Sequence, residues 1–394
     1  MELKQTITIY DAVMGSGKTT HIIQHMNSNP QHKYIYITPN LEECQRIAEA
    51  CPKLDFKHPS DTKGTKLKDL QRLVELEQNI VSTHAMLTNF TAETIELLYN
   101  RDYHLILDEA IDPCVKYDLK ATDIRMLFDS GTVTIDDDGM TLVWCKDKPE
   151  HNSKFYQEYK LIENGNLVFF DFNRSKKDKE VFIWEMTKGL FESFHSVTIL
   201  TYQFEGSILR SYFDLKGIYY RIDTDTLNRG LKLGHLINVY EGDDLNLIGS
   251  HRTSLASNLK GDPIKGKELG NNIYNYFRNK IGVSSQELLW TTFKEAVKHV
   301  KGKGFTKGFV VHNQKATNKY ASKTALAYGL NLYMPVPVKR YLETRGVEVN
   351  ENVWSLNEML QWIFRSAIRE GNPINIYVPN VRMRGLLTEW IKEH

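Results

Sequence analysis

The chain has 394 residues, of which 50 are basic and 49 acidic, so its formal net charge is only +1. This balance excludes a protein that binds nucleic acid through one global basic field, and any such contact must come from local patches. The length is typical of two domains, and no apolar run approaches the roughly 20 residues needed to cross a bilayer.

The four cysteines, Cys44, Cys51, Cys114 and Cys145, form no C-x-x-C pair. Scattered thiols are typical of a reducing compartment and of neither a disulfide framework nor a zinc site. The first residues lack the apolar core of a signal peptide and lead directly into an apolar run. We therefore expect a cytoplasmic protein.

A glycine-rich segment, Met14-Gly15-Ser16-Gly17-Lys18-Thr19-Thr20, lies between an apolar run at 7–10 and a helical pattern at 20–26. Strand, glycine-rich loop and helix in this order are the context of a phosphate-binding loop. The two glycines let backbone N–H groups approach phosphate oxygens, and the helix N-terminus favours the same anion. Lys18 can reach the β/γ-phosphates and Thr19 can ligate Mg²⁺. The residues expected to bind ATP are Gly15, Ser16, Gly17, Lys18, Thr19 and Thr20.

One residue of this loop departs from the usual pattern, because Ala12 stands where G-x-x-x-x-G-K-[ST] has its first glycine. Alanine is also small, so the loop is retained as a phosphate site. The alternative is a Gly-Ser turn with a chance Lys-Thr pair, which the flanking strand and helix patterns make less attractive.

Short apolar segments alternate with helical patterns through the first third of the chain. Strands are predicted at 33–37, 79–81 and 103–107, and helices at 40–51 and 93–100. Such alternation predicts a parallel sheet covered by helices. Ligands of such sheets bind at the carboxyl ends of the strands.

The pattern changes between about 113 and 185. A β-hairpin is predicted from 131–135 and 140–144 around Asp138-Gly139, and a further strand is predicted at 166–170 before a charged loop at 174–179. We interpret this segment as a β-rich insertion. Two roles remain open for it, an elaborated surface and a grip on a partner or nucleic acid.

A strand at 197–202 and a helix at 207–214 complete the first domain, and a second domain begins near 223. Its predicted strands are 236–240, 288–291, 308–311, 330–334 and 374–378, and its helices are 270–280, 292–301 and 355–369. The sequence therefore predicts an α/β fold with two parallel-sheet domains, 1–222 and 223–394.

The predicted strand Leu105-Ile106-Leu107 ends in two carboxylates, Asp108 and Glu109. Many strands end in an acidic turn, but this pair follows Lys18 by about ninety residues in an alternating α/β pattern. Asp108 would orient Mg²⁺, and Glu109 would polarise the attacking water. The two carboxylates therefore predict that the chain hydrolyses the nucleotide and does not only bind its phosphates.

Asp108-Glu109-Ala110-Ile111 resembles the DEAD/DEAH-box signature of superfamily-two helicases. In that family's order, Ile37-Thr38-Pro39-Asn40 resembles motif Ia, 81–85 resembles the next backbone-contacting segment, and 200–205 takes the place of motif III without its usual Ser-Ala-Thr. The resemblance implies two RecA-like domains with ATP and Mg²⁺ between them. It also implies nucleic-acid contacts from Thr38, Pro39 and Thr83.

Gln361-Trp362-Ile363-Phe364-Arg365-Ser366-Ala367-Ile368-Arg369 is similar to motif VI, Q-x-x-G-R-x-x-R, with Phe364 in place of glycine. The spacing predicts that Gln361, Arg365 and Arg369 share one face of a helix. There an arginine can neutralise charge on the γ-phosphate as an arginine finger does, and by resemblance Arg369 is the usual finger. The alternative is a solvated or salt-bridged stripe. The predicted catalytic residues are Glu109, Gln361, Arg365 and Arg369.

Two further segments, 316–320 and 377–384, extend the similarity to a bacteriophage-encoded group of such helicase-like proteins. The resemblance implies a role in phage DNA replication or recombination in the host cytoplasm. Thr317 and Asn318 would position phosphates, or alternatively cap a helix. Lysines between 294 and 307 form either a phosphate-tracking patch or a solvated helix end. The histidines show no H-E-x-x-H spacing, so His84 and His312 are expected to be local hydrogen-bonding residues.

The predicted function is that of an ATP-dependent helicase or translocase with ATP and Mg²⁺ as cofactors. DNA, single-stranded or forked, is the expected partner ahead of RNA. One alternative is a viral DNA-packaging ATPase, whose nuclease carboxylates would have to include Asp243 and Asp244. A second is a nucleotide-gated scaffold with little turnover.

Overall fold

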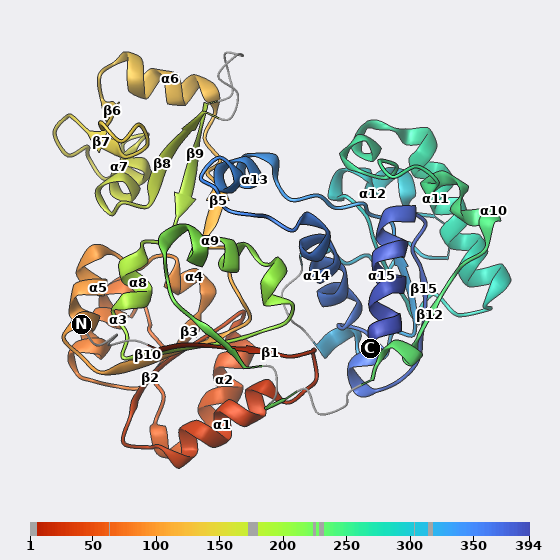
Figure 1. Cartoon of the computed structure of the whole chain (residues 1–394), viewed down its shortest axis with the longest axis horizontal. Helices are drawn as coiled ribbons and strands as arrows, with labels where there is room; N and C mark the ends of the chain where they lie inside the picture. The colour runs from red at the N-terminus through yellow and green to blue at the C-terminus, as the bar shows by residue number, and fades with distance from the viewer. Residues whose placement is uncertain are drawn as a thin grey trace. The chain divides into compact units, whose positions relative to one another are not determined.

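The computed structural model describes residues 6–62, 64–171, 180–223, 226–227, 232–302, 304–313 and 318–394 (Figure 1). The chain divides into two compact units. The first comprises Met1–Asp11, Lys18–Asp223 and Pro335–Val349, and the second comprises Ala12–Gly17, Thr224–Met334 and Asn350–His394.

The first unit is built on a six-stranded parallel sheet with the strand order β11-β1-β10-β4-β2-β3. The strands are β1 (Thr6–Asp11), β2 (Lys33–Thr38), β3 (Ile80–Thr83), β4 (Tyr103–Asp108), β10 (Ser196–Thr201) and β11 (Arg221–Asp223). The expected strands at 7–10, 33–37, 79–81, 103–107 and 197–202 are therefore confirmed. Because all six run parallel, their carboxyl ends meet at one edge of the sheet.

Helices cover both faces of this sheet, and the strands are apolar on both faces for that reason. The helices are α1 (Lys18–Ser28), α2 (Leu41–Ala50), α3 (Lys66–Glu75), α4 (His84–Leu87), α5 (Ala92–Tyr99), α8 (Lys188–Glu192) and α9 (Ile208–Lys216). Ile106 and Tyr36 pack with α1 and α2 on one face. Leu105 and Leu107 pack with α3, α4, α5, α8 and α9 on the other.

The insertion is a small antiparallel subdomain with its own core, which includes Leu127, Val133 and Phe182. Its elements are β5 (Cys114–Lys116), α6 (Ala121–Asp129), β6 (Val133–Ile135), β7 (Leu142–Trp144), α7 (Tyr156–Glu163), β8 (Leu167–Asp171) and β9 (Glu180–Glu185). β6 and β7 form the expected hairpin, with Val133 opposite Trp144, and β8 is also confirmed. The predicted charged loop at 174–179 lies outside the described residues.

One helix of the first unit comes from the C-terminal half of the chain. This helix, α13 (Val336–Glu343), packs against β5 and α9. Tyr341 of α13 donates its hydroxyl hydrogen to Glu185 Oε2 at 2.6 Å, and Lys216 of α9 pairs with the other oxygen of Glu185. A buried carboxylate thus joins β9, α9 and α13.

The second unit contains a four-stranded parallel sheet with the order β12-β15-β14-β13. Its strands are β12 (Ile237–Val239), β13 (Leu288–Thr291), β14 (Ala325–Tyr328) and β15 (Ile374–Tyr377). Its helices are α10 (Asp243–Asn246), α11 (Pro263–Tyr274), α12 (Val297–Val300), α14 (Glu351–Ile363) and α15 (Val381–Glu393). The predicted α/β class with two parallel sheets and a β-rich insertion is confirmed.

Two strand predictions in this unit are wrong. Residues 308–311 contribute only a bridge from Phe309 to Trp290, and 330–334 form no strand. The third strand is instead Ala325–Tyr328, whose Ala325 and Ala327 side chains share one core cluster with Leu269 of α11 and Trp290 of β13. The alternating pattern at 330–334 was misleading because Asn331 fixes a loop, donating its amide hydrogens to the carbonyls of Arg252 and Ser254.

Helix predictions in the second unit also needed correction. The expected helix at 292–301 is a 3₁₀ turn, Lys294–Ala296, followed by the single turn α12. The expected helix at 270–280 is the end of α11 followed by a π-helical turn, Asn275–Lys280.

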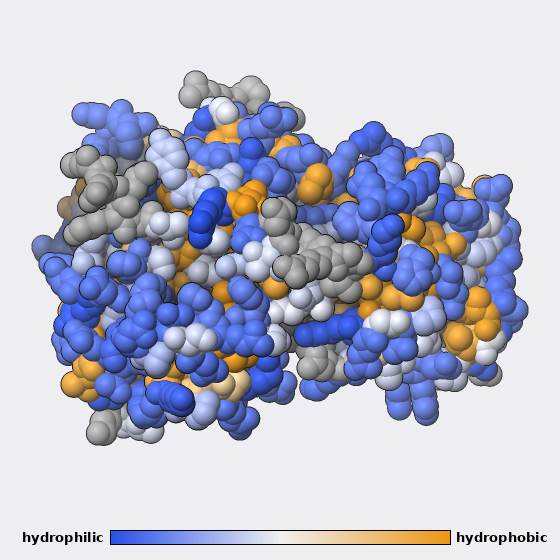
Figure 2. Space-filling model, turned by 60° about the horizontal axis from the view of Figure 1, so that its bottom comes forward, coloured by the Kyte–Doolittle hydropathy of each residue, from blue (hydrophilic) through white to orange (hydrophobic). Residues whose placement is uncertain are grey.

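The surface seen in Figure 2 is mostly hydrophilic, with apolar side chains in small separate groups. Exposed large apolar residues such as Tyr219, Leu247 and Ile264 lie far apart in the sequence. Among the described residues, no helix has the length and apolar character required to cross a membrane.

Candidate functional site

The phosphate-binding loop has the backbone that its sequence predicts. Gly15 and Gly17 have φ values of +84° and +87°, a region that residues with a Cβ rarely adopt. A hydrogen bond from Ser16 N to Val13 O (3.2 Å) closes the turn, and α1 begins at Lys18. The side-chain oxygen of Ser16 is buried and has no hydrogen-bond partner among the described residues. The loop thus presents positive-φ glycines, an unsatisfied hydroxyl and a helix N-terminus together.

Thr19 and Asp108 come together although 89 residues separate them. Thr19 Oγ1 lies 3.4 Å from Asp108 Oδ2, and the Tyr36 hydroxyl donates to the same Oδ2 at 2.9 Å. The three residues belong to α1, β4 and β2. A threonine hydroxyl beside a carboxylate is an oxygen pair of the kind that Mg²⁺ prefers.

The charge state of Asp108 reflects opposing effects. Burial raises the pKa of its carboxyl above the usual value, while the Tyr36 hydrogen bond and the nearby charge of Lys18 lower it. Burial, and after it the Asp108 carboxylate, hold the pKa of Tyr36 well above its ordinary value, so Tyr36 remains a donor. Tyr36 is a site residue that the sequence argument missed. Its position three residues before Pro39 on the strand next to Asp108 is the signal that could have identified it.

Just beyond the ends of β4 and β10, two residues have left-handed backbones: Glu109, which follows β4 directly, with φ +66°, and Gln203, two residues after β10, with φ +52°. Residues other than glycine adopt this region at a cost, and functional sites are among the places where they gather. Glu109 N donates to Leu200 O at 3.0 Å, and Phe204 N donates to Asp11 Oδ2 at 3.0 Å. The expected motif III segment is therefore fastened to the ends of β1 and β4.

The groups of this site suit a phosphate group and a divalent cation. The oxygens of Thr19 and Asp108 suit a divalent cation. The space where a Cβ at Gly17 would stand is open, since no described atom beyond Gly17 and its two chain neighbours lies within 4 Å of that position. An anion there would face the N-terminus of α1.

The expected nucleic-acid residues have different environments. Thr38 and Pro39 are buried, and Thr38 Oγ1 has no hydrogen-bond partner in the described part of the chain, whereas Thr83 is half-buried. Thr317 lies outside the described residues, and Asn318 begins a 3₁₀ turn, Asn318–Tyr320. The role of these five residues stays a prediction.

The predicted single helix that carries Gln361, Arg365 and Arg369 is wrong. α14 ends at Ile363, because Ser366 N and its Oγ both bond to Ile363 O and the chain then becomes extended. Gln361 therefore lies on α14, Arg365 lies in the turn, and Arg369 lies in a separate 3₁₀ turn, Ala367–Glu370.

The two arginines consequently differ in exposure. Arg365 is buried, with 7% of its surface exposed, and its Nη1 donates to His312 O at 2.9 Å. Arg369 is exposed. Gln361 Nε2 lies 3.4 Å from Asn357 Oδ1 within the same helix.

Other charged side chains from the sequence argument have structural partners. Arg382 is buried and bonds to Asn331, Leu332 O and Ser355. Asp244 pairs with Lys280 at 3.0 Å and accepts from the Tyr240 hydroxyl. In the described ranges, no three metal-ligating side chains converge on one point.

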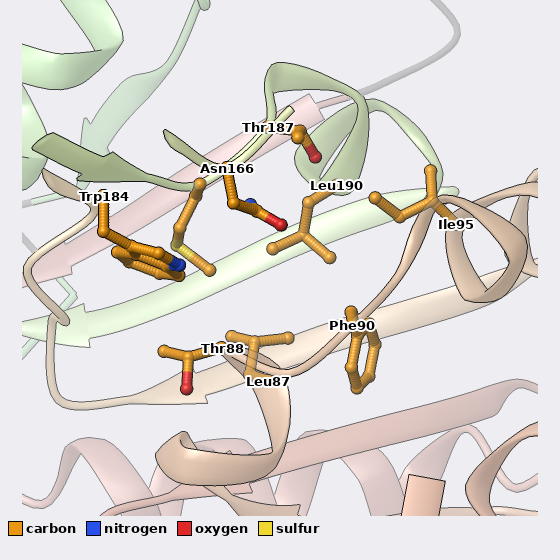
Figure 3. A pocket seen from close by; sticks show the side chains of 9 residues that line it. Leu87, Thr88, Phe90, Ile95, Asn166, Trp184, Thr187 and Leu190 are labelled. Atoms are coloured by element: carbon orange, nitrogen blue, oxygen red, sulfur yellow. The ribbon is translucent and has the colours of Figure 1, made fainter. Parts of the chain in front are cut away.

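A small pocket lies between the insertion and the helices that follow β3 (Figure 3). Leu87, Thr88 and Phe90 form one side, and Asn166, Trp184 and Leu190 form the other. Its volume of about 10 Å³ is close to the space of one water molecule, so it is a packing feature with no room for a substrate.

Comparison with known proteins gives the family. The chain is 36% identical to the SPbeta prophage-derived uncharacterized protein YonV of Bacillus subtilis (strain 168), over 98% of this chain and 99% of that protein. The chain belongs to the YonV family. The model of the YonV middle domain matches residues 115–184, and that of the YonV C-terminal Rossmann-like domain matches 231–391. The insertion at 113–185 is thus the YonV middle domain.

Solved structures show the same fold. The structure named XPD_APO has a TM-score of 0.55 at 13% identity, covering 99% of this chain and 96% of that chain. XPD_Helicase has a TM-score of 0.54 at 12% identity, covering 99% and 95%, and Xpd4 of S. tokodaii has 0.53 at 12%, covering 98% and 94%. The YonV-family chain therefore has a helicase-like fold.

Proposed function

We propose that this YonV-family protein is an ATP-dependent helicase or translocase that acts on DNA, in phage DNA replication or recombination. The observation that carries the proposal is the approach of Thr19 to Asp108 beside a glycine loop of positive φ. The helicase-like fold and the prophage origin of the B. subtilis relative support it.

In this proposal, Lys18 and the loop N–H groups bind the phosphates, and Thr19 and Asp108 hold the metal ion. Mg-ATP, when bound, supplies the phosphoryl group that is transferred to water. Glu109 accepts a proton from that water and orients it. By donating to Oδ2, Tyr36 favours the ionised form of Asp108.

Arg369 is the arginine we assign to the transition state. An arginine finger must reach the γ-phosphate, and the exposed Arg369 is available for that role. Arg365 is buried and bonded to a carbonyl of its own unit, so we assign it to the stability of the turn that carries Arg369. The specific superfamily-two assignment rests on the motif resemblance and is part of this proposal.

The test is ATP hydrolysis measured alone and with single-stranded DNA, duplex DNA, forked DNA and RNA. We expect stimulation by DNA, and a loss of turnover in Glu109→Gln with nucleotide binding retained. The matched control is Glu75→Gln, which changes an exposed glutamate at the end of α3. Hydrolysis that no nucleic acid stimulates and that Glu109→Gln leaves intact would contradict the proposal and favour a nucleotide-gated scaffold.

A further inference from the structure

The carbonyl of Asp108 has an unusual position in the sheet. Glu109 N donates to Leu200 O of β10, and the N–H and C=O of one trans peptide point in opposite directions. The Asp108 carbonyl therefore points away from β10, toward β2 on the other side of β4.

Strand β2 has no donor to offer at this place. The register pairs Ile35 with Leu105 and Ile37 with Leu107, so the next donor in the ladder to Asp108 O would be the N–H of residue 39. Residue 39 is proline, which has no N–H. The ladder of hydrogen bonds between β2 and β4 therefore stops one bond early, and the unpaired acceptor is the carbonyl of Asp108, the residue before Glu109.

His84 supplies a donor in its place. Its Nε2 lies 2.8 Å from Asp108 O, and because a carbonyl oxygen only accepts, Nε2 carries the hydrogen. His84 is the first residue of α4 and is only 9% exposed. The other end of α4 is buried too, since Leu87 is only 1% exposed and lines the pocket opposite Trp184 and Asn166 of the middle domain (Figure 3).

We infer that His84 is a positioning residue for ATP hydrolysis, an inference that rests on the proposed function. It holds the Asp108–Glu109 peptide in one orientation. That orientation keeps Glu109 in its left-handed conformation and fixes the direction of its carboxylate. In this inference His84 acts on hydrolysis through that peptide alone.

The test compares His84→Leu, which removes the donor, with His84→Gln, whose side-chain amide places an N–H near the position of Nε2. We expect kcat for ATP to fall about 10- to 100-fold in His84→Leu, as small misplacements of a catalytic group do, with KM unchanged and kcat restored in His84→Gln. His58→Leu is the matched control, because His58 Nδ1 also contacts a strand carbonyl, Val81 O at 2.9 Å, away from Asp108. An unchanged kcat in His84→Leu, or equal losses in the Leu and Gln variants, would overturn the inference.

A second variant tests the missing ladder donor. Pro39→Ala returns an N–H to residue 39, so the double variant Pro39→Ala/His84→Leu should recover basal kcat relative to His84→Leu. A double variant no faster than His84→Leu would contradict this account. If His84→Leu does not fold, His84→Gln and the double variant are compared with the wild type. A tenfold lower kcat in both of them would overturn the inference.

Hydrogen exchange separates this inference from the proposed function. The Glu109 amide should exchange faster in His84→Leu than in the wild type and be protected again in His84→Gln. If the wild type shows no ATP hydrolysis, the proposed function fails while this exchange pattern still tests His84. If the wild type hydrolyses ATP and exchange is the same in all variants, the inference alone fails.

Discussion

The hydroxyl of Tyr36 donates to Asp108 Oδ2 at 2.9 Å, on the same oxygen that Thr19 approaches. Neighbouring strands β2 and β4 therefore share a partly buried hydrogen bond at the carboxyl edge of the first sheet. The bond favours the ionised form of Asp108 against the effect of burial.

Replacement of this tyrosine should shift the pH dependence of hydrolysis. Tyr36→Phe removes a hydrogen bond that lowers the pKa of Asp108, so that pKa rises further and the carboxylate is protonated at higher pH. We expect the acid limb of the kcat/KM profile to move to higher pH. Tyr34→Phe is the control, since Tyr34 donates to the Asn29 carbonyl away from Asp108. An acid limb that both variants leave in place would disprove a role for Tyr36 in the ionisation of Asp108.

Replacement of Arg369 should lower activity, whereas replacement of Arg365 should lower stability. Arg369→Ala removes an exposed guanidinium, so we expect unchanged thermal unfolding and a loss of turnover of about 10³-fold or more, as for other arginine fingers. Arg365→Ala removes a buried donor to His312 O, and we expect about 1–3 kcal/mol lower stability. Melting curves and single-turnover hydrolysis of both proteins check this, and the opposite assignment would exchange the two results.

The buried carboxylate of Glu185 should make its partner lysine important for folding. Glu185 is 5% exposed, and Lys216→Met would leave its charge without the ammonium. Loss of one partner of a buried ion pair costs about 3–5 kcal/mol. Lys188→Met breaks the exposed pair with Glu192 and should cost about 1 kcal/mol or less. Urea unfolding of the two variants measures the difference, and similar midpoints would show that Tyr341 alone suffices to hold Glu185.

His104 should make the protein less stable in acid. Its pKa is lowered from 6.5 to about 4, mainly by burial and further by the neighbouring His32, His195 and His25. The charge of Asp102 acts in the opposite direction. Its ring stacks on His32 at 4.5 Å and lies 4.8 Å from His195.

The lowered pKa of His104 sets the direction in which stability changes with pH. Between pH 6.5 and about 4, the unfolded chain binds a proton at this position and the folded chain does not. Stability is fully present above pH 6.5 and is lost as the pH falls through this range. Melting temperatures measured against pH should fall less steeply for His104→Gln, which can still bond to Ser196 as Nδ1 does at 2.7 Å. A slope equal to that of the wild type would show that His104 does not contribute.

The chain's local patterns were enough to predict most of the first unit. The glycine loop, the strand that ends in Asp108, and the hairpin around Gly139 are set by the backbone freedom of glycine and by runs of apolar residues. These signals act over a few residues, so they can be recognised without the rest of the molecule.

Other features depended on contacts between distant segments. The strand Ala325–Tyr328 is recognised by its packing, since Ala325 and Ala327 share one core cluster with Leu269 of α11 and Trp290. Helix α14 ends at Ile363 because Ser366 competes for a helix carbonyl. Burial of Arg365 and exposure of Arg369 follow from that ending.

The sequence by itself determined which residues carry the phosphate-site chemistry, because the glycine loop with its lysine and the acidic strand end are each written within a few neighbouring residues. Only the tertiary structure decided which groups support them. Tyr36 and His84 reach Asp108 from other elements, and the need for His84 arises because the sheet register places a proline opposite the Asp108 carbonyl. Register is a property of paired strands, and no single segment contains it.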